Sequence, residues 1–122
     1  NKQYGTHACV SEFTYEKVKD QFEFRQLDRI RVKGKEVPIT IYELIGLKNS
    51  LSETAINLIR KIEEGLNLYQ QKDFVNAKAC FTNCLEIYSE DTPSQVFIDR
   101  CEHFISNPPD STFNGVWVYE TK

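Results

Sequence analysis

Apolar side chains recur every three to four residues in the second part of the chain, which is the spacing of one face of an α-helix. The first such series follows residue 50 and ends near Lys72; its members are Ala55, Leu58, Ile59, Ile62 and Leu66. Ser50 followed by Glu53 has the pattern of a capping box, in which the two side chains bind backbone N–H groups at a helix start. The pattern predicts a helix that Ser50 caps.

Two more helices are predicted downstream of this one. Asp73 is a suitable N-cap for the second, whose apolar positions are Ala77, Phe81, Leu85 and Tyr88. The third begins at Thr92-Pro93, with Gln95 in the reciprocal capping position, because proline is favoured in the first turn of a helix. Its apolar face contains Phe97, Ile98, Cys101 and Phe104 or Ile105. Asn107-Pro108-Pro109 ends it, since proline cannot continue a helix.

The first part of the chain has a different pattern. A short apolar run, His7 to Val10, predicts a strand, and Ser11 is placed to cap a helix over residues 12–19. Residues 22–44 then alternate in the manner of a two-stranded hairpin with Lys33-Gly34-Lys35 at its tip. The alternation changes phase near Gln26, and one extra residue there, a β-bulge, would restore it.

The tail over residues 113–119 alternates β-branched and aromatic side chains and holds the only tryptophan. We expect it to dock as an edge strand; a loosely ordered terminus is the alternative. The whole chain is therefore predicted to be α+β, with one domain over residues 1–46 and a second, helical one over residues 47–122.

Composition and charge limit the functions that remain. The chain has 122 residues, of which 40% are hydrophobic and 12% aromatic, enough to bury a core. Its net charge is −3, and the negative charge is concentrated in residues 47–122, which argues against a general nucleic-acid binder. No apolar run is long enough to span a bilayer, and no secretory signal precedes residue 20. We expect a cytoplasmic protein without direct membrane contact, whose longer parent carries any membrane anchor before Asn1.

The four cysteines form no evident disulfide framework, so free thiols in a reducing compartment are expected. A zinc site from Cys80, Cys84, Cys101 and His103 is conceivable from their spacing. We disfavour it, because a Cys-x-His pair on a helix points its side chains apart and Cys101 belongs to an apolar face.

The first two helices resemble one tetratricopeptide repeat. The similarity lies at Gly65, Leu68, Phe74, Ala77, Phe81 and Cys84. Lys61 and Ser89 depart from the repeat pattern, at the tryptophan-like and proline positions. One repeat cannot bury its face alone, so we expect these helices to pack against the first part, a partner chain or the tail.

The order of motifs in residues 1–46 resembles the end of the catalytic domain of class III nucleotide cyclases. The similar segments are Lys2-Gln3-Tyr4-Gly5-Thr6, Ser11-Glu12, the stretch from Phe24 to Lys35, and Ile41-Tyr42-Glu43-Leu44. Bacterial cyclases of this kind also carry a short helical tail that ends in Pro-Pro and Gly-Val-Trp motifs, which Pro108-Pro109 and Gly115-Val116-Trp117 match.

This resemblance implies an enzyme that cyclises a nucleoside triphosphate, most simply ATP to cyclic AMP and pyrophosphate, for cyclic-nucleotide signalling. It implies that Lys33 binds the triphosphate, that Mg or Mn ions assist in the intact parent, and that a second cyclase domain completes a homodimer. The metal-binding aspartates and the transition-state residues of the family would precede Asn1, and Asp20 and Asp28 do not match the metal positions. We therefore expect no catalytic residue and no turnover in this chain, and the choice between ATP and GTP is unreadable from it.

Arg29 and Arg31 alternate with Lys33 along one strand face and form a candidate phosphate-facing stripe, although a solvated face opposite Ile30 is the simpler interpretation. A different class of function is also open. The helices from Ser50 to Ile105 would then be a repeat-like interaction or dimerisation module, and the hairpin only its platform.

Overall fold

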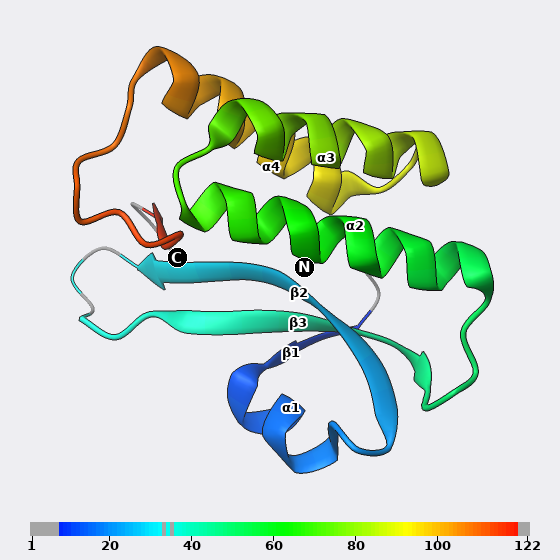
Figure 1. Cartoon of the computed structure of the whole chain (residues 1–122). Coiled ribbons are helices and arrows are strands. Elements are labelled where there is room, and N and C mark those ends of the chain that lie inside the picture. Colours follow the sequence, from blue (N-terminus) through cyan, green and yellow to red (C-terminus); the bar gives the residue numbers. More distant parts are fainter. Residues whose placement is uncertain (1–7, 33, 35, 120–122) are drawn as a thin grey trace. The chain divides into compact units, whose positions relative to one another are not determined.

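The computed structural model describes residues 8–32, 34 and 36–119. The chain divides into two compact units (Figure 1). Residues 8–51 together with 116–119 form the sheet unit, and residues 52–115 form the helical unit. Four strands and four helices lie within the described residues, and this confirms the predicted mixed α+β class.

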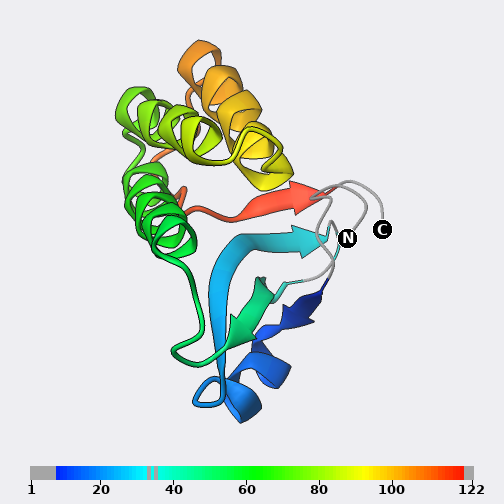
Figure 2. The ribbon, with the colours of Figure 1, turned by 90° about the vertical axis from the view of Figure 1, so that its right-hand side faces the viewer.

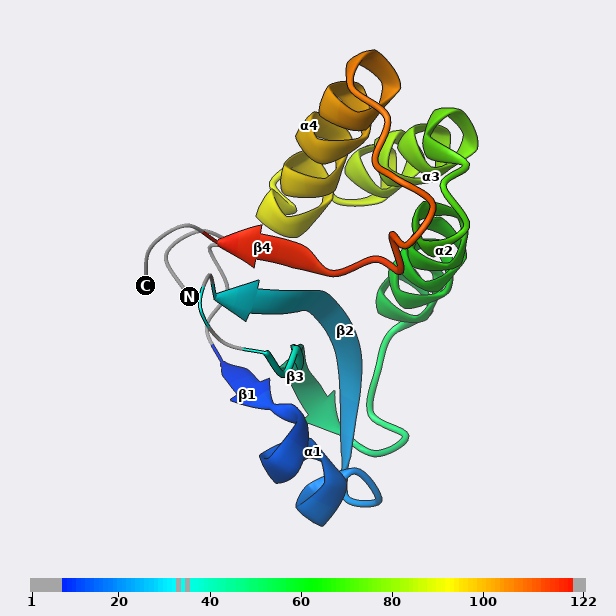
Figure 3. The same cartoon turned by 90° about the vertical axis from the view of Figure 1, so that its left-hand side faces the viewer.

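The sheet unit is a four-stranded sheet with one short helix. Its elements are β1 (Cys9–Ser11), α1 (Glu12–Val18), β2 (Phe22–Val32), β3 (Ile39–Leu47) and β4 (Trp117–Tyr119). The strand order is β1-β3-β2-β4, so the predicted hairpin of β2 and β3 forms the centre of the sheet (Figure 3). Strands β1, β3 and β2 pair antiparallel, whereas β4 pairs with β2 in parallel.

The predicted bulge lies where the alternation changes phase. Gln26 pairs with Tyr42 and Asp28 pairs with Ile41, so Leu27 is the extra residue between them. A bulge turns the following side chains to the other face, which reconciles the two halves of β2. Leu27 is only 1% exposed, so the bulge buries a large apolar side chain.

Helix α1 packs on the hairpin through aromatic rings. Ser11 caps the helix as predicted, because its side chain accepts a hydrogen bond from the Thr14 backbone N–H. The ring of Tyr15 stacks on Tyr42 of β3 with 3.8 Å between centroids, and it meets Phe24 of β2 edge-on at 5.1 Å. These rings tie the helix to both strands of the hairpin.

The helical unit consists of α2 (Glu53–Gln70), α3 (Phe74–Ile87) and α4 (Thr92–Ser106). Asp73 caps α3 as predicted, because its Oδ1 accepts from the Asn76 backbone N–H. The prediction for α2 was wrong by two residues: Ser52 is its N-cap and accepts from the Ala55 N–H. The Ser50 hydroxyl instead donates to the Leu47 carbonyl oxygen and so closes the turn after β3.

The start of α4 also differs from the expectation. Its N-cap is Asp91, and Pro93 lies in the first turn as predicted. The Gln95 side chain does not reach back to the helix start; its Nε2 donates to Asp99 one turn further on. Asp91 Oδ2 instead accepts from the Ser94 hydroxyl at 2.6 Å, and both residues are almost fully buried.

One apolar core joins the three helices. It consists of Ile62, Leu66, Tyr69, Phe74, Ala77, Phe81, Cys84, Phe97, Ile98 and Cys101. Helices α2 and α3 approach closely at Gly65, where an added Cβ would lie 2.9 Å from the Cζ of Phe81. From the resemblance to a tetratricopeptide repeat, we expected small residues where these two helices meet. Gly65 and Ala77 are both buried in the structure. Whether the unit is a tetratricopeptide repeat stays a prediction.

Candidate functional site

The hairpin of β2 and β3 is the frame of the candidate site. The two strands pair from Phe22 opposite Leu47 to Ile30 opposite Ile39. Strand β2 continues for two more residues, to Val32, beyond the last of these pairs. The predicted triphosphate-binding residue, Lys33, follows directly in the sequence. The end of β2 therefore determines where the tip begins.

The tip itself comprises residues 33–38. Gly34 has φ of +92°, a backbone conformation that favours glycine, and nothing lies within 4 Å of where its Cβ would be. Gly34 is thus an exposed turn residue, as the hairpin prediction required. Lys33 and Lys35 lie outside the described residues, as do His7 and the motif over residues 2–6. The role of Lys33 stays a prediction.

Arg29 and Arg31 lie two residues apart on β2, past its bulge, so strand alternation places them on one face of the sheet. Both are half-buried rather than fully exposed. The Arg29 backbone N–H donates to Asp28 Oδ1 at 2.8 Å, and Asp28 is fully buried. The two candidate phosphate-facing residues therefore lie on the strand that leads to the tip. The buried Asp28 carboxylate stabilises the backbone of this strand at Arg29.

A buried ion pair lies deeper in the hairpin and was missed from the sequence. Arg25 Nε donates to Glu43 Oε1 at 2.7 Å, and the two side chains are 5% and 14% exposed. They occupy directly paired positions on β2 and β3. The sequence contains the two opposite charges, but it does not show that they are paired. That pairing depends on the register of β2 and β3, which shifts on either side of Arg25.

The tail forms a strand beside the end of β2, which confirms the edge-strand prediction. Ile30 pairs with Trp117, Arg31 with Val118, and Val32 with Tyr119 (Figure 2). Residues from the far end of the chain therefore lie beside the candidate phosphate-facing Arg31. The sequence did not reveal this partner or the parallel direction.

The cysteines of the helical unit are embedded in its core. All four cysteines of the chain are free thiols, and Cys80, Cys84 and Cys101 are buried. Burial raises the pKa of the Cys101 thiol to about 12, because a thiolate would lose its hydration there. Within the part of the chain that the structure describes, no three His, Cys, Asp or Glu residues are grouped to hold a metal ion.

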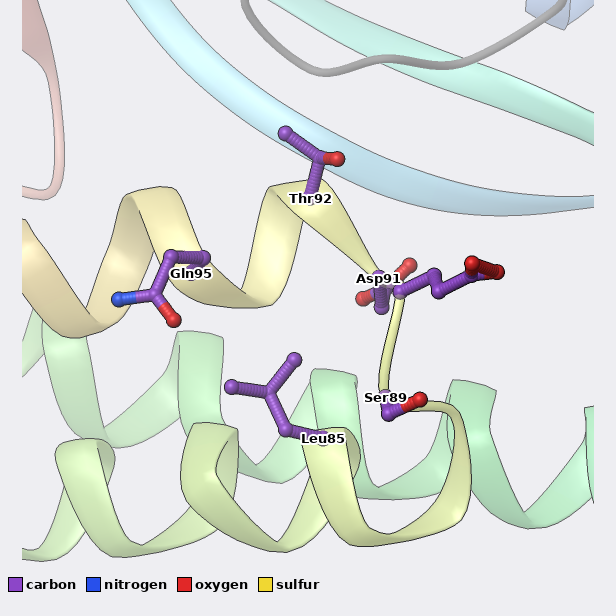
Figure 4. A pocket seen from close by; sticks show the side chains of 6 residues that line it. Leu85, Ser89, Asp91, Thr92 and Gln95 are labelled. Atoms are coloured by element: carbon purple, nitrogen blue, oxygen red, sulfur yellow. The ribbon is translucent and has the colours of Figure 1, made fainter.

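One pocket of about 230 Å³ lies in the helical unit, at the turn between α3 and α4 (Figure 4). It is lined by Leu85, Ser89, Glu90, Asp91, Thr92 and Gln95. Its volume is below the range of typical small-molecule sites, about 300 to 1,000 Å³. Its buried carboxylate, Asp91, is bound by the Ser94 hydroxyl. None of the residues predicted to bind substrate lines this pocket.

The chain shows distant, partial similarity to adenylate cyclases. It is 30% identical over 104 residues to "Adenylate cyclase, terminal-differentiation specific" of Dictyostelium discoideum, a match that covers 82% of this chain and 5% of that protein. It is 33% identical over 54 residues to "Adenylate cyclase 1" of Rhizobium meliloti (strain 1021), covering 44% of this chain and 8% of that protein. The chain thus corresponds to a small part of each relative. No family model matches it, and no solved structure does.

The length of the first match bears on both units. A segment that covers 82% of the chain must extend well into the helical unit, because residues 1–51 make up less than half of the chain. The similarity to a cyclase is therefore not confined to the hairpin. No helix in the described ranges combines the length and apolar character needed to cross a bilayer.

Proposed function

We propose that this chain is the C-terminal portion of a class III nucleotide cyclase and comprises the end of its catalytic domain together with a helical unit. The observation that carries the proposal is the hairpin whose tip follows two arginines on one strand face, because the match to one adenylate cyclase covers 82% of the chain and so includes most of that hairpin. The reaction would convert a nucleoside triphosphate, ATP most simply, to the cyclic nucleotide and pyrophosphate in cytoplasmic signalling.

The contribution of this chain would be to hold the triphosphate. Lys33 follows the end of β2, and its ammonium group carries a compact positive charge on a flexible stem, suited to phosphate oxygens. Arg29 and Arg31 would add positive charge on the adjoining strand face. Cations next to the leaving pyrophosphate stabilise the charge that develops on it as the bond to the α-phosphorus breaks.

The residues that the structure describes do not fit the Mg or Mn ions that such a reaction uses. The described residues hold no group of three metal-ligating side chains, and the buried Asp28 carboxylate accepts the Arg29 backbone N–H. The metal-binding carboxylates and the remaining catalytic groups would come from upstream segments of the longer protein. We further propose that a second cyclase domain completes the site as a homodimer, and that the chain alone has no turnover.

The test is Lys33→Ala in the longer cyclase that contains this chain. Loss of one charge-assisted hydrogen bond to phosphate costs about 1 to 3 kcal/mol, so kcat/KM for the nucleotide should fall by about 5- to 150-fold. The matched control is Lys35→Ala, which removes the same charge from the other side of Gly34. Cyclic nucleotide formation is measured by chromatography over a range of ATP and GTP concentrations.

Two results would contradict the proposal. Equal kinetics for Lys33→Ala and the unchanged protein would remove Lys33 from the site. Equal losses for Lys33→Ala and Lys35→Ala would assign the effect to the general charge of the tip rather than to one ligand.

A further inference from the structure

The tail of the chain is anchored within the helical unit just before it enters the sheet. The Phe113 ring packs among the aromatic side chains of that unit, with centroid distances of 5.5 Å to Tyr69, 5.8 Å to Phe74 and 5.1 Å to Phe104. Aromatic pairs at these separations stabilise beyond their buried area, so Phe113 is a firm attachment point.

A second anchor follows two residues later, at Gly115. This residue is buried and has φ of +91°, in the region that favours glycine. A Cβ at this position would lie 2.6 Å from the Cγ of Gln70, the last residue of α2. The backbone therefore lies against the Gln70 side chain, and a larger residue would be strained by the positive φ and would require that side chain to move.

The other end of the tail is anchored in the sheet unit. Among the described residues, the pairing of β2 with β3 ends at Ile30 opposite Ile39, whereas the pairing with β4 continues to Val32 opposite Tyr119. The register thus pairs Arg31 and Val32 with β4. The strand residues that lead directly into the tip are held by the tail.

We propose that β4 is a positioning strand that fixes the end of β2 and thereby the approach of Lys33 to the triphosphate, a role that rests on the proposed function of Lys33. Only Val116 separates the anchor at Gly115 from the first paired residue, Trp117.

The proposed role of β4 has a physical basis in the length of the connection between β2 and β3. Two-residue turns fix the geometry of a hairpin end, and the connection between β2 and β3 is longer than that, with six residues. Arg31 and Val32 lie past the last antiparallel pair and gain a neighbouring strand from β4. Parallel pairing with β4 holds these two residues in the sheet, so the strand that leads to Lys33 would be positioned before nucleotide binds.

The first arm of the test uses this chain and does not depend on nucleotide. The two variants are Gly115→Ala, which disturbs the anchor, and deletion of residues 116–122, which removes β4. Both should accelerate hydrogen exchange of the Ile30–Val32 amides. The matched control is Gly46→Ala, another glycine of the hairpin, whose Cβ would meet only the side chains of Ser50 and Leu51, at 3.2 and 3.4 Å. Its exchange at Ile30–Val32 should match that of the unchanged chain.

Fluorescence of Trp117 is a second, independent measurement in this first experiment, because Trp117 is the only tryptophan and lies in β4. Release of the strand in Gly115→Ala should shift its fluorescence to longer wavelength. Unchanged exchange at Ile30–Val32 in both the Gly115→Ala and deletion variants would overturn the proposal, since β4 would then not hold the end of β2.

The second arm measures nucleotide kinetics in the longer cyclase, with the deletion, Lys33→Ala and their combination. The deletion should raise KM by no more than Lys33→Ala does, and should change KM by less than about twofold when Lys33 is already alanine. If β4 had only a structural role, the deletion would raise KM by the same factor whether residue 33 is lysine or alanine. That result would overturn the proposal. If Lys33→Ala raises KM but the deletion does not, the proposed role of β4 is overturned and the proposed role of Lys33 stands. If Lys33→Ala leaves KM unchanged, both proposed roles are overturned.

Discussion

Replacing Gly65 by alanine tests how closely α2 and α3 pack. Gly65 lies within α2, where alanine is favoured over glycine by about 1 kcal/mol from helix propensity alone. The added Cβ, however, would lie 2.9, 3.0 and 3.1 Å from three atoms of the Phe81 ring. Separations below 3.0 Å require a neighbour to move, since carbon atoms in contact prefer about 3.5 to 4.0 Å.

Phe81 has little room to move. It is 0% exposed, and its ring stacks on Phe97 with 5.0 Å between centroids and 18° between planes. Forcing an extra carbon into a packed core costs about 1 to 3 kcal/mol. Subtracting the propensity gain leaves a net loss of up to about 2 kcal/mol, so packing rather than propensity should determine the sign. For a chain of this size, that loss lowers Tm by several degrees.

The assay is urea unfolding followed by far-ultraviolet circular dichroism, on the unchanged chain and on Gly65→Ala. The matched background is Phe81→Leu, which removes the ring atoms nearest to Gly65. In that background Gly65→Ala should become neutral or stabilising, so the double-mutant cycle should give a coupling of about 1 to 2 kcal/mol. A gain of about 1 kcal/mol from Gly65→Ala in the unchanged chain would refute the close contact.

Two further predictions concern buried ionisable groups. Burial raises the pKa of Cys101 to about 12 in the folded chain. As the pH rises, the unfolded chain therefore loses this proton first. The free energy of unfolding should then fall above about pH 9, by up to about 1.4 kcal/mol per pH unit. Urea unfolding between pH 8 and 10 should show a smaller fall for Cys101→Ala, and equal slopes would count against the shift. Glu43→Met should destabilise the chain by about 3 kcal/mol because it removes the carboxylate that the buried Arg25 contacts, whereas Arg25→Met combined with Glu43→Met should recover most of that loss. Thermal unfolding compares the variants, and a double variant no more stable than Glu43→Met would contradict this reasoning.

The helices were largely predictable because their signals are local. Apolar spacing, the Asp73 cap and the proline at the start of α4 each act within one or two turns of chain. The N-cap of α2 was misplaced because two serines precede Glu53, and only the fold reveals that the Ser50 hydroxyl is engaged with Leu47. A choice between equivalent local caps depends on where the preceding strand ends.

The sheet was predictable only in part. Alternation predicted the hairpin and a bulge near Gln26, which the structure has at Leu27, but not the second irregularity, between Glu23 and Phe24. The pairing of β4 with β2 joins Trp117 to Ile30, residues with the whole helical unit between them in sequence. No local pattern encodes a pairing over that distance, so the partner of the tail, and with it the environment of Arg31, required the structure.

The order of the elements bears on how the two units are related in function. The chain leaves the sheet unit after residue 51, builds three helices and returns at residue 116 to pair beside the predicted phosphate-binding tip. The helical unit is therefore inserted between two strands of one sheet rather than appended after it. An appended module is joined by one chain connection, whereas an inserted one is joined by two, here after residue 51 and before residue 116. The segment from Gly115 to Trp117 is therefore the covalent link from the helical unit to the strand that pairs with the end of β2, and in sequence β4 is separated from its partner strand by three helices.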